Sequence, residues 1–249
     1  MSNKEYKTSE YVVAFIDILG SSDAIKKDAD NSLNVVHRAY EKAIEEYEGL
    51  FENISGHRIK KPISKIFSDN IVVAIQYSQE KYKRSAFLAT AMISAMIQIE
   101  FLNHGWLTRG GIAAGSFFCD EIMVWGKALV SAYELENKVA VYPRVVIDPD
   151  LIRQLNLALA DKDDNAKQWI RQDRDGLFYI EYLSNYLKNL EIFIISEIER
   201  VDENIVENVK SIKVCQKWIW LGSYLNERLA EIIKESSENN GKTNEEQRD

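Results

Sequence analysis

The sequence is poor in the residue types that build disulfide frameworks and thiolate metal sites. Its 249 residues include 2 cysteines, 3 histidines and 3 prolines. Cys119 and Cys215 lie far apart, and no two histidines have the spacing of zinc ligands, so neither a zinc motif nor a disulfide framework is indicated. Because the N-terminus lacks a signal-peptide pattern, we expect a cytoplasmic protein with free thiols.

Basic charge is also scarce. Lys and Arg total 31 against 39 Asp and Glu, which gives a formal net charge of -8 and an isoelectric point near 5.1. Proteins that bind nucleic-acid backbones usually present basic surfaces, so no nucleic acid polymer is expected as a partner. The longest apolar runs are interrupted by charge, so no membrane is expected either. An anionic small ligand is still compatible with this charge if a metal ion supplies the countercharge.

Apolar residues, in contrast, are plentiful. The hydrophobic fraction of 46% and the aromatic fraction of 10% are enough for a folded core. We find no internal repeat and no linker rich in Pro or Ser, so a single domain over residues 11–235 is predicted. Residues 1–10 are polar and are expected to be flexible. Residues 236–249 are rich in Glu, Asn and Lys, and we expect them to be disordered.

Hydrophobic patterns predict an α+β fold. The run "YVVAFIDILG" (11–20) is typical of a central strand that is buried on both faces. The order of elements before residue 150 is β-α-β-β-α-β-α-β, which indicates a ferredoxin-like βαββαβ layer with extra helices and a helical C-terminal extension. Further strands are predicted at about 58–67, 71–76, 106–118, 143–148 and 176–183, and helices at 22–50 (interrupted near 28–31), 78–105, 126–140, 148–160 and most of 189–237.

Two polar residues interrupt the strand-like stretch "SKIFSDNIVVAI" (64–75). Asp69 and Asn70 could form a simple hairpin turn, because Asp and Asn side chains hydrogen-bond to their own backbone. Asp17, however, ends the buried run, where a carboxylate is costly without compensation. In a βαββαβ layer the two segments can be neighbours, and two adjacent carboxylates repel each other unless a divalent cation lies between them. Mg²⁺ or Mn²⁺ suits such a site.

Each signal has an ordinary structural alternative. An Asp at a strand end is commonly a cap or turn residue, Arg109 in "TRGGIAAG" could be a surface residue or form an ion pair, and the glycines beside it could be bulges. The joint pattern is more specific. "FIDILG", "KIFSDN", "RGGIAAG" and "VWGKALVSAYELE" occur in this order over about residues 11–147, and together they resemble the signatures of class III nucleotidyl cyclases. These enzymes are dimers with a ferredoxin-like catalytic core.

The resemblance implies roles for individual residues. Asp17 and Asp69 match the metal-binding aspartates, with the carbonyl of Ile18 as a further ligand, and two Mn²⁺ or Mg²⁺ ions are expected. Arg109 matches the arginine that contacts the terminal phosphates. The turn whose amides hold the triphosphate corresponds to Leu19, Gly20 and Ser21.

The chain differs from the usual cyclases at positions that recognise the nucleotide base and at positions that stabilise the transition state. Lys65 coincides with the lysine that reads adenine in adenylate cyclases, but Met123 stands where those enzymes carry a purine-reading aspartate. Val130 and Glu134 occupy the places of the Asn and Arg that stabilise the transition state. A one-residue shift would bring Ser131 to the Asn position, but it supplies no arginine.

This combination resembles the pyrimidine cyclases of the bacterial Pycsar antiphage systems. In that reading Met123, Trp125 and Tyr133 narrow the base pocket toward a single ring, although core or interface packing would equally explain Trp125 and Tyr133. We predict conversion of a pyrimidine nucleoside triphosphate, UTP favoured, to its 3′,5′-cyclic monophosphate. The resemblance further implies a homodimer with active sites at its interface and a downstream effector that responds to the cyclic nucleotide. A cytidylate or purine cyclase is the enzymatic alternative.

Two non-enzymatic functions also fit the sequence. A catalytically inactive homologue that binds nucleotide as a regulatory module is favoured by the missing Asn and Arg and opposed by the two aspartates. An interaction protein without metal could use "WIWLGSYL" (218–225) as a contact surface. Trp218, Leu221 and Leu225 in that segment have helical spacing, which is more typical of a core.

Overall fold

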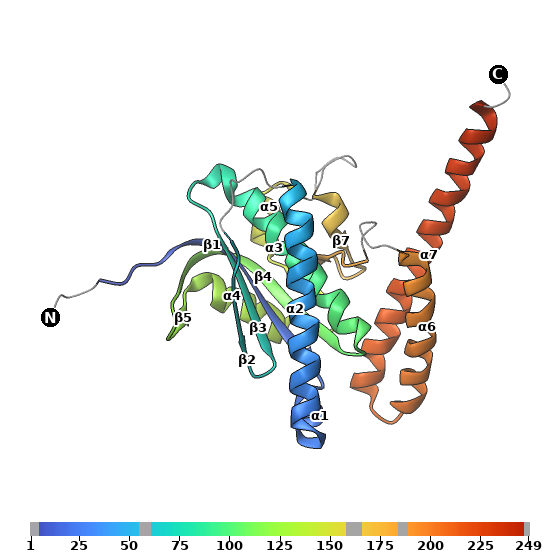
Figure 1. The fold of residues 1–249 in the computed structure, drawn as a ribbon. Helices are drawn as coiled ribbons and strands as arrows, with labels where there is room; N and C mark the ends of the chain where they lie inside the picture. Colours follow the sequence, from blue (N-terminus) through green and yellow to red (C-terminus); the bar gives the residue numbers. More distant parts are fainter. Residues whose placement is uncertain (1–4, 55–60, 158–165, 184–188, 247–249) are drawn as a thin grey trace. The chain divides into compact units, whose positions relative to one another are not determined.

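The computed structural model describes residues 5–54, 61–157, 166–183 and 189–246, which form two compact units (Figure 1). The first unit is Met1–Tyr182 and the second is Leu183–Asp249. The boundary lies between the predicted core of about residues 11–147 and the predicted helical segment of about 189–237, within the single domain that the sequence predicts.

A mixed sheet is the centre of the first unit. Its path is β2-β3-β1-β4-β6-β8-β7, and β5 pairs with β4 outside this path. The neighbours of β1 are both antiparallel to it, whereas β4 and β6 run parallel. The strands are β1 (Ser9–Leu19), β2 (Ile63–Phe67), β3 (Asn70–Gln76), β4 (Leu107–Cys119), β5 (Val124–Trp125), β6 (Val145–Ile147), β7 (Ile170–Gln172) and β8 (Phe178–Ile180).

Helices cover both faces of this sheet. Val13 and Phe15 of β1 pack with Ala128 and Ala132 of α4 (Lys127–Lys138). Because side chains alternate along a strand, the intervening buried residues of β1 point to the other face, where α3 (Lys83–Asn103) packs. In Figure 1, α2 (Ala29–Ile54) lies against α3. The remaining helical segments of this unit are α1 (Ser21–Lys27), η1 (Glu80–Tyr82), α5 (Pro149–Gln154) and η3 (Lys167–Trp169).

The predicted ferredoxin-like core is confirmed. In chain order, β1, the α1–α2 pair, β2, β3, α3 and β4 give βαββαβ, and the four strands lie side by side as β2-β3-β1-β4. The predicted break in the first helical region falls at Asp28, between α1 and α2. The predicted start of β2 at residue 58 and the end of the 148–160 helix lie outside the described residues. β1 begins at Ser9, inside the segment expected to be flexible.

The helix α3 is apolar on every side. The segment Glu80–Asn103 is long and apolar enough to cross a membrane by length and composition, contrary to the expectation from the sequence. Of its most apolar window, 89% is buried inside the fold. Its composition is therefore explained by its place as the central helix of the first unit.

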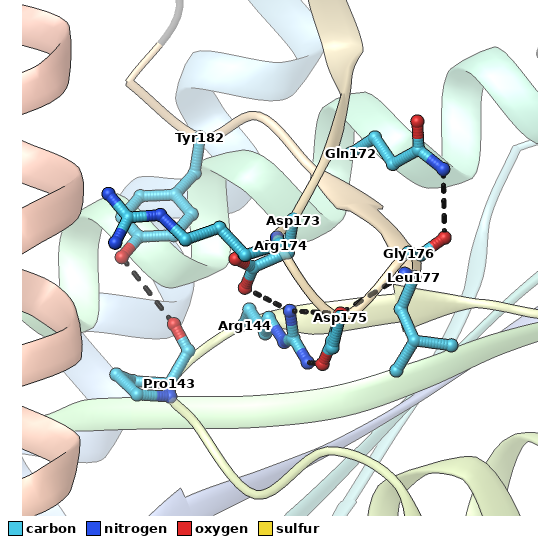
Figure 2. A network of polar contacts seen from close by, with 9 residues as sticks. All are labelled: Pro143, Arg144, Gln172, Asp173, Arg174, Asp175, Gly176, Leu177 and Tyr182. Atoms are coloured by element: carbon cyan, nitrogen blue, oxygen red, sulfur yellow. Dashed lines mark hydrogen bonds and ion pairs between the residues drawn. The ribbon is translucent and has the colours of Figure 1, made fainter.

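A buried arginine fixes the last hairpin of this unit (Figure 2). The Arg144 guanidinium donates to the carboxylates of Asp173 and Asp175 in the β7–β8 turn, and it lies 5.5 Å from the ring centre of Tyr142. Burial alone would raise the pKa of Asp175, but hydrogen bonds from Arg144 and the Leu177 N–H lower it. The carbonyl of Arg144 accepts from Gly110 N at 3.1 Å, so the hairpin is joined to the strand that carries Arg109.

The second unit is a pair of helices, α6 (Leu190–Glu207) and α7 (Ile212–Glu246). They approach closely at Gly222, where a Cβ atom would lie 3.1 Å from Val201 Cγ1. Trp218, Leu221 and Leu225 are buried, as their helical spacing predicts. The helix α7 continues to Glu246, whereas the sequence predicts a disordered tail from Ser236.

Candidate functional site

The candidate metal aspartates lie on adjacent strand ends. Asp17 near the end of β1 is paired across the sheet with Asn70 on one side and with Arg109 on the other. The backbone N–H of Ile18 donates to the carbonyl of Asp69 at 2.9 Å. The break in the 64–75 stretch is therefore a hairpin turn, and this turn places Asp69 directly beside the end of β1.

Asp69 is held in position by its neighbours. Ser21 Oγ donates to Asp69 Oδ2 at 2.9 Å, and Asn70 Nδ2 donates to Oδ1 at 3.0 Å. Ser68, the preceding turn residue, has a left-handed φ of 57°, and Gly20 before α1 has a φ of 80°. Glycine adopts such a φ without steric cost, which brings Ser21 within reach of the aspartate.

Arg109 connects Asp17 to the helix on that face of the sheet. Its Nε donates to Asp17 Oδ2 at 3.2 Å, and its Nη1 donates to the carbonyl of Ala140 at 3.3 Å. Its Nη2 lies 2.6 Å from Oε1 of Glu136. The guanidinium is thus oriented by three separate oxygen partners.

Glu136 is the residue of this site that the sequence reasoning missed. It lies on α4 and is 4% exposed. Burial raises its pKa, the Arg109 guanidinium opposes this, and the charges of Asp17 and Asp69 add to the rise. A signal was available, because Glu136 follows Ala128 and Ala132 at intervals of four and therefore falls on the buried stripe of the helix.

The oxygen donors present suit a hard divalent cation. Two carboxylates and the nearby Ile18 carbonyl are ligands of the kind that Mg²⁺ and Mn²⁺ prefer, with phosphate and water oxygens completing the shell. Within the described ranges there is no cluster of three or more His, Cys, Asp or Glu side chains arranged for a metal ion. The donor set therefore fits an ion that arrives together with a phosphate-bearing substrate.

A cavity of about 470 Å³ opens beside Asp69. Its polar lining is Ser21, Ser32, His37, Ser68 and Asp69, and Trp106, just before β4, contributes an aromatic wall. Its apolar lining comes from β1, β2 and the two helices that follow β1: Ile18, Ile25, Ala29, Leu33, Val36 and Ile66. There is room for a small organic ligand next to Asp69, whereas Asp17 does not line this cavity.

Two of the residues expected to recognise the base, Met123 and Trp125, lie near the far end of β4 from Arg109. Met123 and Trp125 are 48% and 67% exposed, and they line an open cavity of about 870 Å³ with Tyr6, which packs on Phe118. Trp125 pairs with Phe118, nine positions along β4 from Arg109, which corresponds to about 30 Å of extended strand. A single copy therefore does not bring Met123 and Trp125 to Asp17.

The other candidate residues lie on α4 and β2. Tyr133 of α4 packs edge-on against Phe15 at 5.5 Å, near the Asp17 end of β1. Lys65 is half-buried on β2. Burial raises the pKa of the Cys119 thiol, and the charge of Lys65 opposes this rise. Val130 is exposed, and Glu134 forms a surface ion pair with Lys138 at 2.7 Å.

The structure resembles nucleotide cyclases only distantly. A crystal structure of an adenylate/guanylate cyclase/hydrolase from Silicibacter pomeroyi aligns with a TM-score of 0.43 and 13% identity, covering 71% of this chain and 99% of that one. A class III adenylyl cyclase-like ATP-binding protein from Pseudomonas aeruginosa aligns with a TM-score of 0.40 and 10% identity, covering 70% and 39%. No protein-family model and no curated protein matches the sequence. Likenesses this distant say nothing of activity, so the function is inferred from the residues of the site.

Proposed function

We propose that the protein is a metal-dependent nucleotidyl cyclase. The observation that carries this proposal is the placement of Asp17 and Asp69 on adjacent strand ends, with Arg109 hydrogen-bonded to Asp17. The reaction joins the ribose 3′-oxygen to the α-phosphorus, breaks the bond between that phosphorus and the bridging oxygen of pyrophosphate, and releases the hydroxyl proton.

The residues have separate tasks in this reaction. Asp17, Asp69 and the Ile18 carbonyl would hold two Mg²⁺ or Mn²⁺ ions, which lower the pKa of the 3′-hydroxyl and neutralise triphosphate charge when bound. The turn of Leu19, Gly20 and Ser21 offers backbone N–H groups to the phosphates at the start of α1. Arg109 stabilises charge on the departing pyrophosphate, and Glu136 fixes the direction of its guanidinium.

A direct test uses the four nucleoside triphosphates. The protein is incubated with each of them and Mn²⁺, and the products are identified by mass spectrometry together with pyrophosphate release. We expect a 3′,5′-cyclic monophosphate.

Substitution of the aspartates tests the metal site. We expect Asp17→Ala and Asp69→Ala to abolish formation of the cyclic product while the chain stays folded. Asp23→Ala is the matched control, since Asp23 is a largely exposed carboxylate on neighbouring α1. Near-normal turnover by Asp69→Ala would contradict the proposal.

The finer assignment is a pyrimidine cyclase, UTP favoured, that works as a homodimer. Its support is the resemblance to the Pycsar cyclases, which implies base recognition by Lys65, Met123, Trp125 and Tyr133 of a second copy. For Met123 and Trp125, the distance along β4 between Trp125 and Arg109 also favours a second copy. Cyclic CMP or a cyclic purine nucleotide as the main product would replace this assignment and leave the cyclase proposal intact.

A second candidate function is an inactive homologue that binds nucleotide as a regulatory module. Val130 and Glu134 favour it, because neither supplies the polar groups that the usual cyclases place there, and Glu134 is already paired with Lys138. Thermal stabilisation by a nucleoside triphosphate and Mn²⁺ without pyrophosphate release would establish this alternative.

The proposed biological role is synthesis of a second messenger in antiviral defence, by resemblance to the Pycsar cyclases. The protein would act in the cytoplasm, and an effector that responds to the cyclic nucleotide would act downstream. Cells that carry the protein and such an effector should show fewer phage plaques than cells carrying Asp17→Ala. Equal plaque numbers would remove the defence role.

A further inference from the structure

The helix α7 carries a second periodic stripe on the face away from its buried residues. Trp218, Leu221, Leu225 and Arg228 form the buried side. Eight exposed residues follow alternating intervals of four and three along the rest of the helix: Ile212, Gln216, Ile219, Ser223, Asn226, Ala230, Ile233 and Ser237. This is the spacing of a coiled-coil seam, and the three isoleucines in it are 72%, 50% and 52% exposed.

We propose that this stripe of α7, over residues 212–230, pairs antiparallel with the same residues of a second copy of the chain. A seam with heptad spacing is covered most completely by another helix with the same spacing. In an antiparallel pair centred on Leu221, Ile212 meets Ala230 and Ile219 meets Ser223. The two isoleucines within the overlap of residues 212–230 then each face a smaller side chain, which suits close packing, and Ile233 lies beyond this overlap.

The polar residues of the stripe agree with the same register. Gln216 lies opposite Asn226, so the two amides can hydrogen-bond to each other instead of facing an isoleucine. Shifting the pairing by one heptad, centred between Tyr224 and Leu225, would place Gln216 against Ile233. A polar pair within a coiled-coil seam is a known way to select one register.

Charge complementarity favours this arrangement over the alternatives. Lys213 and Glu227 follow the stripe positions Ile212 and Asn226, and in the proposed register Lys213 of one copy lies next to Glu227 of the other, twice per pair. The shifted register would instead bring Lys213 near Lys234, with like charges in contact. The helix α7 has no acidic residue before Glu227, so its first half is basic. This half is attracted to the second half of a partner helix, which contains Glu227.

Disulfide trapping in the full chain tests the proposal without relying on catalysis. Cys119 and Cys215 are first replaced by serine, and Gln216→Cys and Asn226→Cys are made in separate, differently tagged chains. We expect a cross-linked heterodimer when the two chains are mixed under mild oxidation, and little cross-linking of either alone. Cross-linking of Gln216→Cys with itself would indicate parallel pairing, and no cross-link in the mixture would indicate another partner for the stripe; each result overturns the proposal.

Two sets of further substitutions identify the contact. Ile219→Glu should reduce the cross-linked fraction by about tenfold, because it buries a charge in the seam. Ile192→Glu is the matched control on α6, where Ile192 is 69% exposed, and it should have no effect. Lys213→Glu should weaken the cross-link and the exchange Lys213→Glu/Glu227→Lys should restore it. Failure of the exchange to restore it would contradict the antiparallel register, whatever the outcome of the cyclase assays.

Discussion

At the scale of single residues, the orientation of one guanidinium decides what the site can do. Arg109 donates to Asp17 and to the Ala140 carbonyl, and its guanidinium forms an ion pair with Glu136. Because the donors of arginine are rigid and planar, fixing two of them fixes the third. Glu136 is the buried member of this set, so the direction of Arg109 depends on a residue that would not itself touch the substrate.

If Arg109 acts on the leaving pyrophosphate, Glu136 should matter as a positioning residue. Glu136→Ala is expected to lower kcat by about tenfold to a hundredfold with a smaller change in KM. Glu136→Gln, which keeps an oxygen acceptor, should recover most of the loss. The measurement is steady-state pyrophosphate release, with Lys138→Ala on the exposed side of α4 as control. An unchanged kcat in Glu136→Ala would show that Arg109 is oriented without it.

Glu197 on α6 gives a prediction of stability against pH. It is 2% exposed, and burial raises its pKa to about 7, although Arg200 opposes this. Because this folded-state pKa is raised above that of the unfolded chain, the stabilisation is fully present below about pH 4.5 and is lost as pH rises through 7. Glu197→Gln should therefore raise the free energy of unfolding at pH 8 by up to about 3 kcal/mol and change it little at pH 4.5. Urea unfolding at both values checks this, and an equal effect at both would contradict it.

Residues near strand ends were easier to anticipate than residues on helices. Asp17 and Asp69 stand out because polar residues interrupt apolar runs, and the strand order then places them together. Glu136 lies in a mostly charged helix, where a buried carboxylate looks like any exposed one unless its spacing from Ala128 and Ala132 is followed.

At the scale of elements, the apolar pattern decided what the sequence could predict, since even the three-residue strands β6 and β8 were predicted from their β-branched and aromatic residues. The strand β1 and the helix α3 have 11 and 21 residues, enough for their patterns to be read. The strands β5 and β7 have two and three residues and exist because a neighbouring strand pairs with them, so no periodicity marks them. The end of α7, residues 236–246, is mostly Ser, Asn, Gly and Thr, which are poor helix formers, so neither hydrophobic pattern nor helix propensity predicts that the helix continues there.

The contact between α4 and the sheet depends on the absence of a side chain at Gly111. A Cβ there would overlap the backbone of Ala132. Gly111→Ala should therefore push α4 outward, lower the stability by about 1–3 kcal/mol and separate Glu136 from Arg109, which would also lower activity. Gly49→Ala is the control, because nothing lies near its Cβ position and Ala favours a helix there. Urea midpoints measure both, and equal midpoints would show that α4 adapts without cost.

At the scale of the whole molecule, the two halves of the proposed site lie at opposite ends of the β1–β4 pair. The metal aspartates and Arg109 are at one end, and Met123 and Trp125 are at the other. Two copies paired by a two-fold axis could bring the end of one to the opposite end of the other, which would also complete both sites at once. The exposure of Trp125 and Ile122 is consistent with burial in such an interface.

Mixing of inactive variants tests this arrangement. Asp17→Ala and Trp125→Ala should each be nearly inactive as pure proteins, the first through the metal site and the second through the base pocket. After mixing and subunit exchange, half of the dimers should be mixed, and each of these has one intact site, so about a quarter of full activity should return. Asp17→Ala mixed with Asp69→Ala should not recover, because both changes lie in the same half of a site. No recovery in the test mixture would show that each copy builds its site alone. Recovery in the control would show that Asp17 and Asp69 of one site come from different copies, which also contradicts this arrangement.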